Sequence, residues 1–292
     1  MNDTVTLKAL AKINLGLDVL GRRDNGYHDV RMVMQTIYLY DNVTMEKTEE
    51  AGIQLECNLF YLPVDETNIA YKAAKLLMDE FDIKEGVRIV LDKHIPVAAG
   101  LAGGSANAAA VLVGMNRLFS LGLSGQELME RGVSLGADVP YCVMRGTVLA
   151  EGIGEILTPL PPLPKCYVLI AKPGISVSTK TVYEKLDSQE ITEHPDIDGI
   201  LEGLDKQDIH KVAASMGNVL ETVTIGDYPI IEEIKHVMKE EGALNAMMSG
   251  SGPTVFGIFD DKSKARQAQE RIRKLQIAKQ VYVANVHNVR RK

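Results

Sequence analysis

A run of small residues over positions 96–118 constrains the fold of this chain more than any other sequence feature. Its first ten residues read PVAAGLAGGS, and glycine permits positive φ and lets the backbone approach another group closely. The residues from Ser105 to about Leu118 are rich in alanine and predict a helix with Ser105 at or near its N-cap. The free amides and the dipole at such a helix start favour an anion such as a triphosphate. Glycines also precede helices in ordinary connectors, and the loop alone gives these two interpretations equal weight.

Hydrophobic periodicity predicts the elements around this run. Up to about residue 60 the chain alternates apolar and polar side chains, which is typical of strands, and the pattern then changes to helical spacing. The predicted strands are 4–10, 13–20, 30–38, 53–57, 87–91, 147–150, 167–171, 246–249, 254–259 and 281–288, with a turn at 24–26. The predicted helices are 68–82, 105–118, 124–135 (capped by Ser124), 179–186, 206–214, 230–241 and one capped by Ser263, and 189–198 is predicted as a loop.

Four prolines between residues 158 and 164 mark a change in composition. Proline stiffens the backbone and removes amide donors, so this segment is interpreted as a connector. We place a domain boundary there, with an N-terminal domain over 1–160 and a C-terminal domain over 161–292. Both halves mix strands and helices without strict βαβ alternation, which predicts an α+β fold in two domains.

Charge and cysteine content exclude several classes of protein. The chain of 292 residues has a formal net charge of −7, whereas nucleic-acid-binding proteins usually carry a basic patch. Its three cysteines are widely spaced and include no CxxC pair, so we expect reduced thiols rather than a disulfide scaffold or a zinc site. The first residues lack a signal-peptide pattern and no long apolar stretch occurs, so we predict a cytoplasmic protein without a membrane segment.

Three further segments carry polar residues in apolar or glycine-rich surroundings. Lys12 and Asn14 fall on one face of a predicted strand and could bind phosphates or a polyol, although an exposed strand face is the simpler alternative. Asp138 lies between small and apolar residues in GADVP, where it is either a buried carboxylate that needs a cationic partner or part of a helix-end turn. The segment MSGSGPTVF, residues 248–256, could close over a phosphate or form only a tight bend.

Common nucleotide-binding signatures are absent from the sequence. It contains no GxxxxGK[ST] loop, no GxGxxG fingerprint, and neither the HRD nor the DFG motif of protein kinases. A phosphate loop at 96–105 would therefore belong to another kinase design.

The four segments, in this order, resemble the GHMP family of small-molecule kinases. The similarity is strongest in AKINLGLDVLGRRDNGYH, in PVAAGLAGGSANAA followed by GADVP, and in MSGSGPTVFGIF, and it extends over essentially the whole chain. The DNGYH segment and the long GLAGGS form are specific to the branch of the family whose acceptor is a cytidyl diphosphate ester of methylerythritol. The resemblance implies an N-terminal domain like domain 2 of ribosomal protein S5 and a ferredoxin-like C-terminal domain. It also implies transfer of the γ-phosphate of ATP to the 2-hydroxyl of that ester, a step of non-mevalonate isoprenoid synthesis.

The resemblance further implies a role for each matching residue. Asp138 matches the catalytic aspartate that accepts the hydroxyl proton, and Lys12 matches the lysine that pairs with it. The positions that match the ATP site are Asn68, Lys93, Pro96, Val97, Ala98, Ala99, Gly100, Leu101, Ala102, Gly103, Gly104, Ser105, Ala106 and Asn107. The positions that match the acceptor site are Asn14, Tyr27, His28, Asp138, Thr179, Tyr183, Gly250, Ser251 and Gly252. Of these, the two tyrosines match the pair that sandwiches the cytosine ring, and His28 matches the residue that reads its edge.

Two positions depart from the family pattern, and they bear on the cofactor. Ala106 stands where relatives usually carry a second serine, and Asn107 stands where they often carry aspartate. Besides Asp138 no carboxylate is an obvious ligand, so we expect Mg²⁺ to be held mainly by ATP and water and predict no metal site built by the protein. The expected cofactors are ATP and Mg²⁺. The expected partner is the small-molecule acceptor, with no nucleic acid and no membrane, and the expected state is a monomer or a weak homodimer.

Three alternatives stay open at this point. The chain could be another GHMP kinase of the homoserine or mevalonate type, a non-catalytic module that keeps the fold, or a nucleic-acid module suggested by the S5-like domain. DNGYH opposes the first, because those acceptors carry no base to stack. The presence of both Lys12 and Asp138 opposes the second, and the negative net charge opposes the third.

Overall fold

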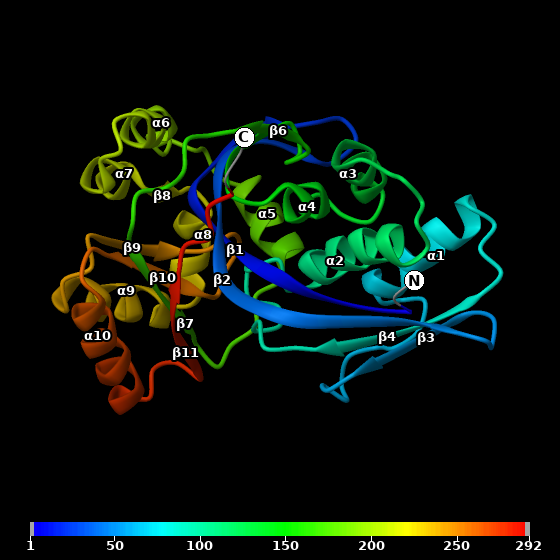
Figure 1. Ribbon diagram of the computed structural model, residues 1–292. Coiled ribbons are helices and arrows are strands. Elements are labelled where there is room, and N and C mark those ends of the chain that lie inside the picture. The colour runs from blue at the N-terminus through cyan, green and yellow to red at the C-terminus, as the bar shows by residue number, and fades with distance from the viewer. Residues whose placement is uncertain (1–2, 290–292) are drawn as a thin grey trace. The chain divides into compact units, whose positions relative to one another are not determined.

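The chain opens with two long strands, β1 (Thr4–Arg22) and β2 (His28–Thr48), in the computed structural model, which describes residues 3–289 (Figure 1). The alternation that predicted separate strands over 4–10 and 13–20 therefore belongs to one strand, and the strand predicted over 30–38 continues to Thr48. Strand-forming and alternating residues continue through both segments, so no local signal ends either strand early.

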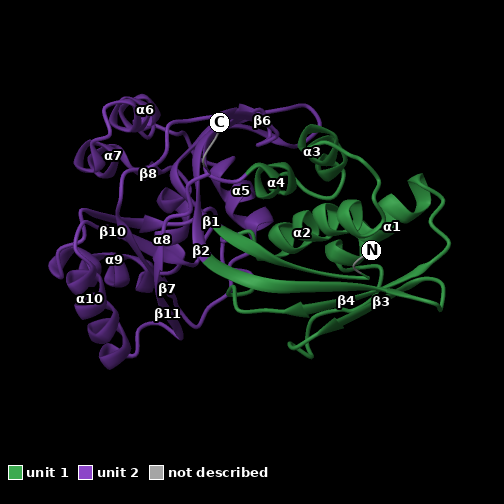
Figure 2. Ribbon diagram, viewed as in Figure 1, with its two compact units in different colours: residues 1–11, 39–97, 102–144 green, residues 12–38, 98–101, 145–292 purple. Residues whose placement is uncertain are grey.

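The chain divides into two compact units whose segments alternate along the sequence (Figure 2). Unit 1 comprises residues 1–11, 39–97 and 102–144, and unit 2 comprises residues 12–38, 98–101 and 145–292. Both long strands contribute residues to both units, and so does the small-residue loop that starts at Pro96. The boundary near residue 160, with domains over 1–160 and 161–292, stays a prediction.

Unit 1 is built from strands covered by helices. Its other elements are β3 (Ile53–Cys57), α1 (Ile69–Glu80), β4 (Gly86–Asp92), α2 (Gly103–Leu118), α3 (Gly125–Val133) and α4 (Val139–Met144). Strand β4 pairs antiparallel with β2, so that Asn42 lies opposite Asp92, and pairs parallel with β3. Figure 2 shows α1 and α2 on the same face of these strands. The prediction of β3 is confirmed at both ends, and the predicted Ser124 cap of α3 is confirmed as a capping box with Glu127.

The core of unit 1 forms where α1 and α2 pack on the strands. Helix α1 buries an i, i+3, i+4, i+7 stripe, as expected for an amphipathic helix. That stripe is Ala70, Ala73, Ala74 and Leu77. Helix α2 is buried along most of its length, and a Cβ atom on Gly114 would lie 1.5 Å from the Cε atom of Met45 in β2. The small residues that mark this helix in the sequence therefore let it approach the sheet closely.

The start of α2 differs from the prediction. The helix begins at Gly103, so Ser105 is its third residue and the predicted N-cap role of Ser105 is wrong. Ala102 occupies the cap position in the left-handed region, with φ 56° and ψ 31°, and no side chain caps the helix. The amides of the first turn consequently have no acceptor from a capping side chain.

Unit 2 contains most of the remaining chain. Its strands are β5 (Thr147–Glu151), β6 (Ile156–Pro159), β7 (Tyr167–Lys172), β8 (Gly217–Asn218), β9 (Asn245–Met248), β10 (Val255–Phe259) and β11 (Gln280–Asn285). Its helices are α5 (Thr179–Leu186), α6 (Ile197–Asp205), α7 (Ile209–Ser215), α8 (Glu221–Asp227), α9 (Ile230–Glu240) and α10 (Lys262–Leu275). The prediction of α5 is confirmed at both ends, whereas α6 and α8 were not predicted.

A four-stranded antiparallel sheet organises the C-terminal part of unit 2. Its strand order is β11-β7-β10-β9, and α9 and α10 pack against it. Strand β10 is buried along its whole length and reads as a continuous apolar run, as expected for a central strand. Elsewhere in unit 2, β5 pairs with β2 and β6, and the short β8 pairs parallel with β1 at Gly16 and Leu17.

Several predicted boundaries in unit 2 are wrong, and each has a local cause. Strand β6 runs into the predicted connector as far as Pro159, because proline is tolerated at the end of an edge strand. The cap of α10 is Asp261 rather than Ser263, since the Asp261 carboxylate accepts from the amides of Ser263 and Lys264. The helix predicted over 206–214 begins only at Ile209, where Asp208 caps it.

Candidate functional site

The loop that precedes α2 adopts an unusual backbone conformation. Every second residue of the loop has a positive φ: 49° at Ala98, 70° at Gly100 and 56° at Ala102. L-residues rarely adopt such angles, and alternation of left-handed residues can turn successive amides toward one point, as in anion-binding nests. A Cβ atom on Gly100 would lie only 2.0 Å from the backbone oxygen of Ser249, so glycine is required there for space as well as for φ.

The first turn of α2 lies beside a lysine. A Cβ atom on Gly103 would lie 3.1 Å from Cγ2 of Ile95 and 3.8 Å from the ammonium nitrogen of Lys93. The ammonium of Lys93 therefore lies close to the amides at this helix start. Amides without a side-chain cap, next to small residues at a helix start, form a setting that suits a phosphate group.

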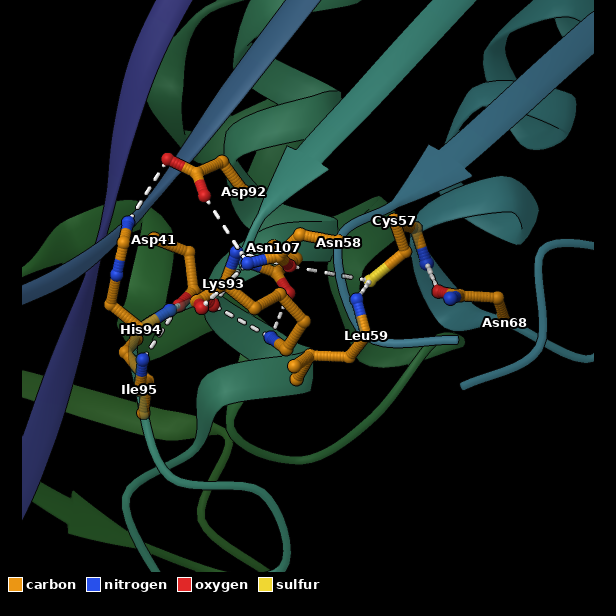
Figure 3. Close-up of polar contacts among 11 residues, drawn as sticks. Asp41, Cys57, Asn58, Leu59, Asn68, Asp92, Lys93, His94, Ile95 and Asn107 are labelled. Atoms are coloured by element: carbon orange, nitrogen blue, oxygen red, sulfur yellow. Dashed lines mark hydrogen bonds and ion pairs between the residues drawn. The ribbon is translucent and has the colours of Figure 1, made fainter. Parts of the chain in front are cut away.

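Lys93 is held in a buried cluster with Asn107, which was also predicted, and with Asp41, which was not (Figure 3). Its ammonium donates to Oδ2 of Asp41 at 2.6 Å and to Oδ1 of Asn107 at 2.6 Å, and Asn107 Nδ2 donates to Asp41 Oδ2 at 2.8 Å. The other oxygen of Asp41 accepts from the amides of His94 at 2.6 Å and Ile95 at 2.8 Å. Asp41 has no exposed surface, and its four donors satisfy the charge that burial would otherwise disfavour.

Asparagines beside this cluster fix the neighbouring backbone. Asn68 caps α1 by accepting from the amide of Ala70, and its Nδ2 donates to the carbonyl of Pro63. Asn58 accepts from the amide of Lys93 and donates to the carboxylate of Asp92 (Figure 3). The contacts of Asp92 with His94 and then with Asn42 hold the pKa of its carboxyl below its usual range. Asn68 and Lys93, both predicted from the resemblance, lie in unit 1. Hydrogen bonds of Asn68 and Asn58 hold the backbone around them.

Asp138 immediately precedes α4 in unit 1. Its carbonyl accepts from the amide of Cys142, so the residue leads directly into the helix. The side chain is half-buried rather than buried, which leaves it more accessible than the sequence context suggested. Gly132 packs against this turn, since a Cβ atom there would lie 2.9 Å from Cγ1 of Val139.

Lys12 and Asn14 lie together inside unit 2. Only 5% of Lys12 and none of Asn14 is exposed, so the alternative of an exposed strand face is wrong. The Lys12 ammonium donates to Oδ1 of Asn14 at 2.7 Å, and the amide of Lys12 donates to the carbonyl of Leu101 at 3.2 Å. A buried ammonium is costly without such partners, and Asn14 supplies one here.

The glycine-serine segment after β9 is tied down at several points within unit 2. Asn218 in β8 donates both amide hydrogens, to the carbonyls of Met248 at 2.9 Å and Gly250 at 2.8 Å. Ser249 Oγ donates to the carbonyl of Gly100 at 3.0 Å. The hydroxyls of Ser251 and Thr179 lie 2.7 Å apart. These contacts bring the predicted residues Ser251 and Gly250 of the segment together with Thr179 and Asn218. Gly252, also predicted, has a positive φ of 87°.

Rings and charges gather around His28 in unit 2. The His28 and Tyr183 rings lie 4.7 Å apart between centroids, with their planes tilted by 38°. His28 Nε2 lies 2.6 Å from Oδ1 of Asp187, and Arg22 Nη1 lies 3.4 Å from the other oxygen of that carboxylate. Tyr27, the neighbour of His28, is 58% exposed. A half-open site with stackable rings and fixed polar groups suits a flat heterocycle.

Several residues of these clusters have no counterpart in the sequence prediction, and three of them make several of the contacts described above. They are Asp41, Asp187 and Asn218. The sequence contains a pattern that could have identified Asp187: it follows Thr179 and Tyr183 at the same four-residue spacing, which places all three on one side of a helix. No such pattern exists for Asp41 and Asn218, since their partners lie far away in the sequence.

Two family models match the chain, one on each side of the proline-rich segment. The model described as GHMP kinases N terminal domain matches residues 68–146, and the model described as GHMP kinases C terminal matches residues 200–278. Each match includes residues described above: the first covers Lys93, the loop before α2 and Asp138, and the second covers the glycine-serine segment.

Curated relatives resemble the chain along nearly all of its length. It is 58% identical over 280 residues to 4-diphosphocytidyl-2-C-methyl-D-erythritol kinase of Lachnospira eligens, covering 96% of this chain and 97% of that protein. It is 50% identical to the enzyme of the same name from Clostridium perfringens, covering 97% of this chain and 98% of that protein.

Solved structures of kinases are also similar to the chain. A crystal structure of 4-(cytidine 5'-diphospho)-2C-methyl-D-erythritol kinase matches with a TM-score of 0.83 at 31% identity, covering 98% of this chain and all of that one. A homoserine kinase from Cytophaga hutchinsonii matches with a TM-score of 0.83 at 22% identity and covers 98% of this chain and 96% of its own, which shows the shared fold alone. The predicted α+β fold is confirmed as the GHMP kinase fold. The chain is thus a small-molecule kinase of the GHMP family, and within it belongs to the 4-diphosphocytidyl-2-C-methyl-D-erythritol kinases.

Proposed function

We propose that this kinase transfers the γ-phosphate of ATP to the 2-hydroxyl of 4-diphosphocytidyl-2-C-methyl-D-erythritol. The observation that carries the proposal is the ring and charge cluster of His28, Tyr183 and Asp187 in unit 2. A kinase that acts on a small aliphatic alcohol has no use for such a cluster, whereas a cytidyl ester offers a base to stack and an edge to bind. The relatives of that name, which cover nearly the whole chain, support the same acceptor.

ATP is the phosphate donor of GHMP kinases, and we assign its phosphates to the small-residue loop and the first turn of α2. The uncapped amides after Ala102 would face the phosphate oxygens. The residues from Pro96 to Asn107 make up this proposed nucleotide site, with Asn68 and Lys93 nearer the adenosine. Such preorganised donors stabilise charge on the transferred group without further rearrangement.

The chemical step is assigned to Asp138 and Lys12. Asp138, which is half-buried, would accept the proton of the attacking 2-hydroxyl as a general base. Lys12 would hold positive charge beside the reacting oxygen, and its hydrogen bond to Asn14 keeps its ammonium in one position. Phosphoryl transfer depends mainly on positioning and on neutralising charge, so two such groups suffice on the acceptor side.

The acceptor would be bound by residues of unit 2. Tyr27 and Tyr183 would stack on the cytosine ring, and His28 would bind its edge. Thr179, Ser251 and the adjacent glycines would bind the diphosphate and the methylerythritol, since their hydroxyls and amides are already grouped. Asn14 would contact the same part of the ester.

Mg²⁺ fits this site as a companion of ATP rather than as a resident ion. Among residues 3–289, no three side chains of His, Cys, Asp or Glu gather into a metal-binding group. Mg²⁺ commonly keeps several waters and takes one or two carboxylates together with substrate phosphates. The Asp138 carboxylate and the Ser105 hydroxyl are the residues that would contact it, and Ala106 supplies no second hydroxyl. When bound, the ion neutralises negative charge on the phosphates.

Release of ADP with a panel of acceptors tests the proposed function. The purified chain would be assayed with ATP, Mg²⁺ and, in turn, the cytidyl ester, homoserine and mevalonate. We expect turnover with the cytidyl ester only. Faster turnover with homoserine or mevalonate would assign the chain to another GHMP activity, and absence of turnover with bound ADP detectable by calorimetry would assign it to a non-catalytic module.

The remaining predictions concern location and assembly. Within the part of the chain that the structure describes, no helix combines the length and the apolar character needed to cross a bilayer. A cytoplasmic location, and a monomer or weak homodimer that binds no nucleic acid, stay predictions.

A further inference from the structure

One face of α5 carries three polar side chains at intervals of four residues. Thr179, Tyr183 and Asp187 follow each other at i, i+4 and i+8, and Asp187 is the C-cap of the helix. Residues with this spacing lie on the same side of a helix. Each of them contacts a residue already assigned to the acceptor site: Thr179 contacts Ser251, and both Tyr183 and Asp187 contact His28.

We propose that Asp187 is a positioning residue that fixes the tautomer of His28 and thereby makes the site select cytosine over uracil. The proposal deepens the proposed function and rests on it, because it concerns the base of the same acceptor. Asp187 would not touch the base itself. It would act only through the imidazole ring of His28.

The geometry around the imidazole determines which nitrogen carries the proton. Oδ1 of Asp187 lies 2.6 Å from Nε2 of His28, and the side chains of His28 and Asp187 are only 10% and 24% exposed. An ionised carboxylate can only accept, so Nε2 must be the donor in this contact. Nη1 of Arg22 lies 3.4 Å from the second oxygen of Asp187. In the neutral ring the proton is then on Nε2, and Nδ1 is left with a lone pair.

A lone pair on Nδ1 distinguishes the two pyrimidines. Cytosine presents a donating amino group at C4, whereas the corresponding group of uracil is an accepting carbonyl oxygen. The amino group can donate to Nδ1, but the oxygen would place two acceptors against each other. A site that offers a fixed acceptor therefore rejects the wrong base through an unsatisfied polar group, which discriminates more strongly than the loss of apolar contact.

Nitrogen NMR of the imidazole tests the first step without any substrate. In ¹⁵N-histidine-labelled chain at pH 8, we expect the His28 signals, assigned with His28→Gln, to show a protonated Nε2 and an unprotonated Nδ1. Asp187→Asn should mix the two tautomers, because an amide can either accept from Nε2 or donate to it. Glu184→Gln is the matched control, since Glu184 lies on the same helix and pairs only weakly with Lys180 at 3.8 Å. Protonation of both nitrogens, or an unchanged tautomer in Asp187→Asn, would overturn the proposal.

Kinetics with two acceptors test the second step. The ratio of kcat/KM for the cytidyl ester to kcat/KM for its uridyl counterpart should fall at least about tenfold in Asp187→Asn, with KM for ATP unchanged. The control Glu184→Gln should keep the ratio of the unmodified chain. Because Asp187 acts through His28, adding Asp187→Asn to His28→Gln should cause no further loss. A ratio that survives in Asp187→Asn, or full additivity of the two substitutions, would contradict the proposal.

The two experiments separate this proposal from the proposed function. If the unmodified chain phosphorylates neither ester, the proposed function fails, and the NMR signals still decide which tautomer Asp187 imposes. If it phosphorylates the cytidyl ester but Asp187→Asn keeps its preference, the function stands and the role of Asp187 is wrong.

Discussion

Lys12 and Asp138 differ in how the protein surrounds them, and this difference suits their proposed roles. Lys12 is 5% exposed and donates to Asn14, so its charge is fixed in place by a buried partner. Asp138 is half-buried at the start of a short helix, where a carboxylate can meet an incoming hydroxyl. In the proposed mechanism Lys12 would neutralise charge and Asp138 would accept the proton.

Removal of either side chain should therefore impair the chemical step more than nucleotide binding. We expect Asp138→Ala and Lys12→Ala each to lower kcat about 10²- to 10⁴-fold, the usual effect of losing a general base or an electrostatic group. Calorimetry should find the affinity for ADP nearly unchanged. Lys75→Ala, which removes an exposed lysine of α1, serves as the control and should keep full activity. Near-normal turnover in either site variant would remove that residue from the mechanism.

At the scale of elements, the loop before α2 depends on the absence of a side chain at one position. Gly100 has φ 70° and would place a Cβ atom 2.0 Å from the Ser249 backbone oxygen, whereas Gly122 has φ 75° and nothing within 4 Å. Gly100→Ala combines backbone strain with a collision against backbone, which cannot move as a flexible side chain can. Gly122→Ala carries the backbone strain alone.

The two glycine variants should thus differ in activity. Gly100→Ala should raise KM for ATP and lower kcat/KM at least about tenfold, since small displacements of positioning groups have large kinetic effects. Gly122→Ala should lose only about 1 kcal/mol of stability and keep its kinetics. Steady-state kinetics and denaturant unfolding of both variants provide the measurement. Equal kinetic effects would mean that glycine is needed at position 100 for its positive φ and not for its close contact with Ser249.

Asp41, which lies within β2, connects that strand to the residues after β4 and to α2 (Figure 3). An amide in its place would present hydrogens to donors, so Asp41→Asn leaves buried donors without acceptors. We expect it to lower the free energy of unfolding by about 1–3 kcal/mol or more and to raise KM for ATP, with KM for the acceptor unchanged.

A nearby carboxylate supplies the control for Asp41. Asp92 lies in the same region, but its side chain is 47% exposed and accepts from side chains rather than from buried amides. Asp92→Asn should change the free energy of unfolding by no more than about 0.5 kcal/mol. If the two variants prove equally stable and bind ATP equally well, the cluster around Asp41 does not organise the nucleotide site.

At the scale of the whole molecule, the reactivity of the three cysteine thiols measures how well the packing protects buried side chains from solvent. Cys57 is half-buried, whereas Cys142 and Cys166 are buried. Burial raises the pKa of the Cys166 thiol to about 12, so it stays protonated and unreactive at ordinary pH. We expect one thiol to react rapidly with a disulfide reagent at pH 8 and the other two only upon unfolding.

Substitution of the accessible cysteine checks this assignment. Cys57→Ser should abolish the rapid phase and leave the slow phase unchanged. Rapid reaction of two thiols in the native chain would show that the packing around Cys142 or Cys166 opens easily.

The sequence predicted those parts of the molecule that local chemistry determines. Strand β3 and helix α5 have their predicted bounds, because alternation and a capping serine act within a few residues. The alternation of side chains along a strand also predicted that Lys12 and Asn14 lie on one face. Asp41 could not be found in this way, since its partners lie 52 to 66 positions away and only the fold brings them together.

The missed start of α2 has a different physical cause. A serine before an apolar run is a common N-cap, but here Gly103 and Gly104 extend the helix by two residues and Ala102 takes the left-handed conformation instead. Glycine gives no helical signal of its own, so the pattern placed the start too late. The difference bears on the proposed phosphate site, because no side chain occupies the amides of the first turn as a cap.

Phosphorus NMR of the reaction product is the most direct test of the proposed transfer. The chain would be incubated with ATP, Mg²⁺ and 4-diphosphocytidyl-2-C-methyl-D-erythritol until ADP accumulates. The carbon that bears the 2-hydroxyl also bears the methyl group and carries no hydrogen, so a phosphate placed there shows no three-bond coupling to a proton. We predict one new phosphomonoester signal that is a singlet in the proton-coupled spectrum, with the diphosphate signals retained. A proton-coupled multiplet, which would place the phosphate on another hydroxyl, or inorganic phosphate as the only new signal would contradict it.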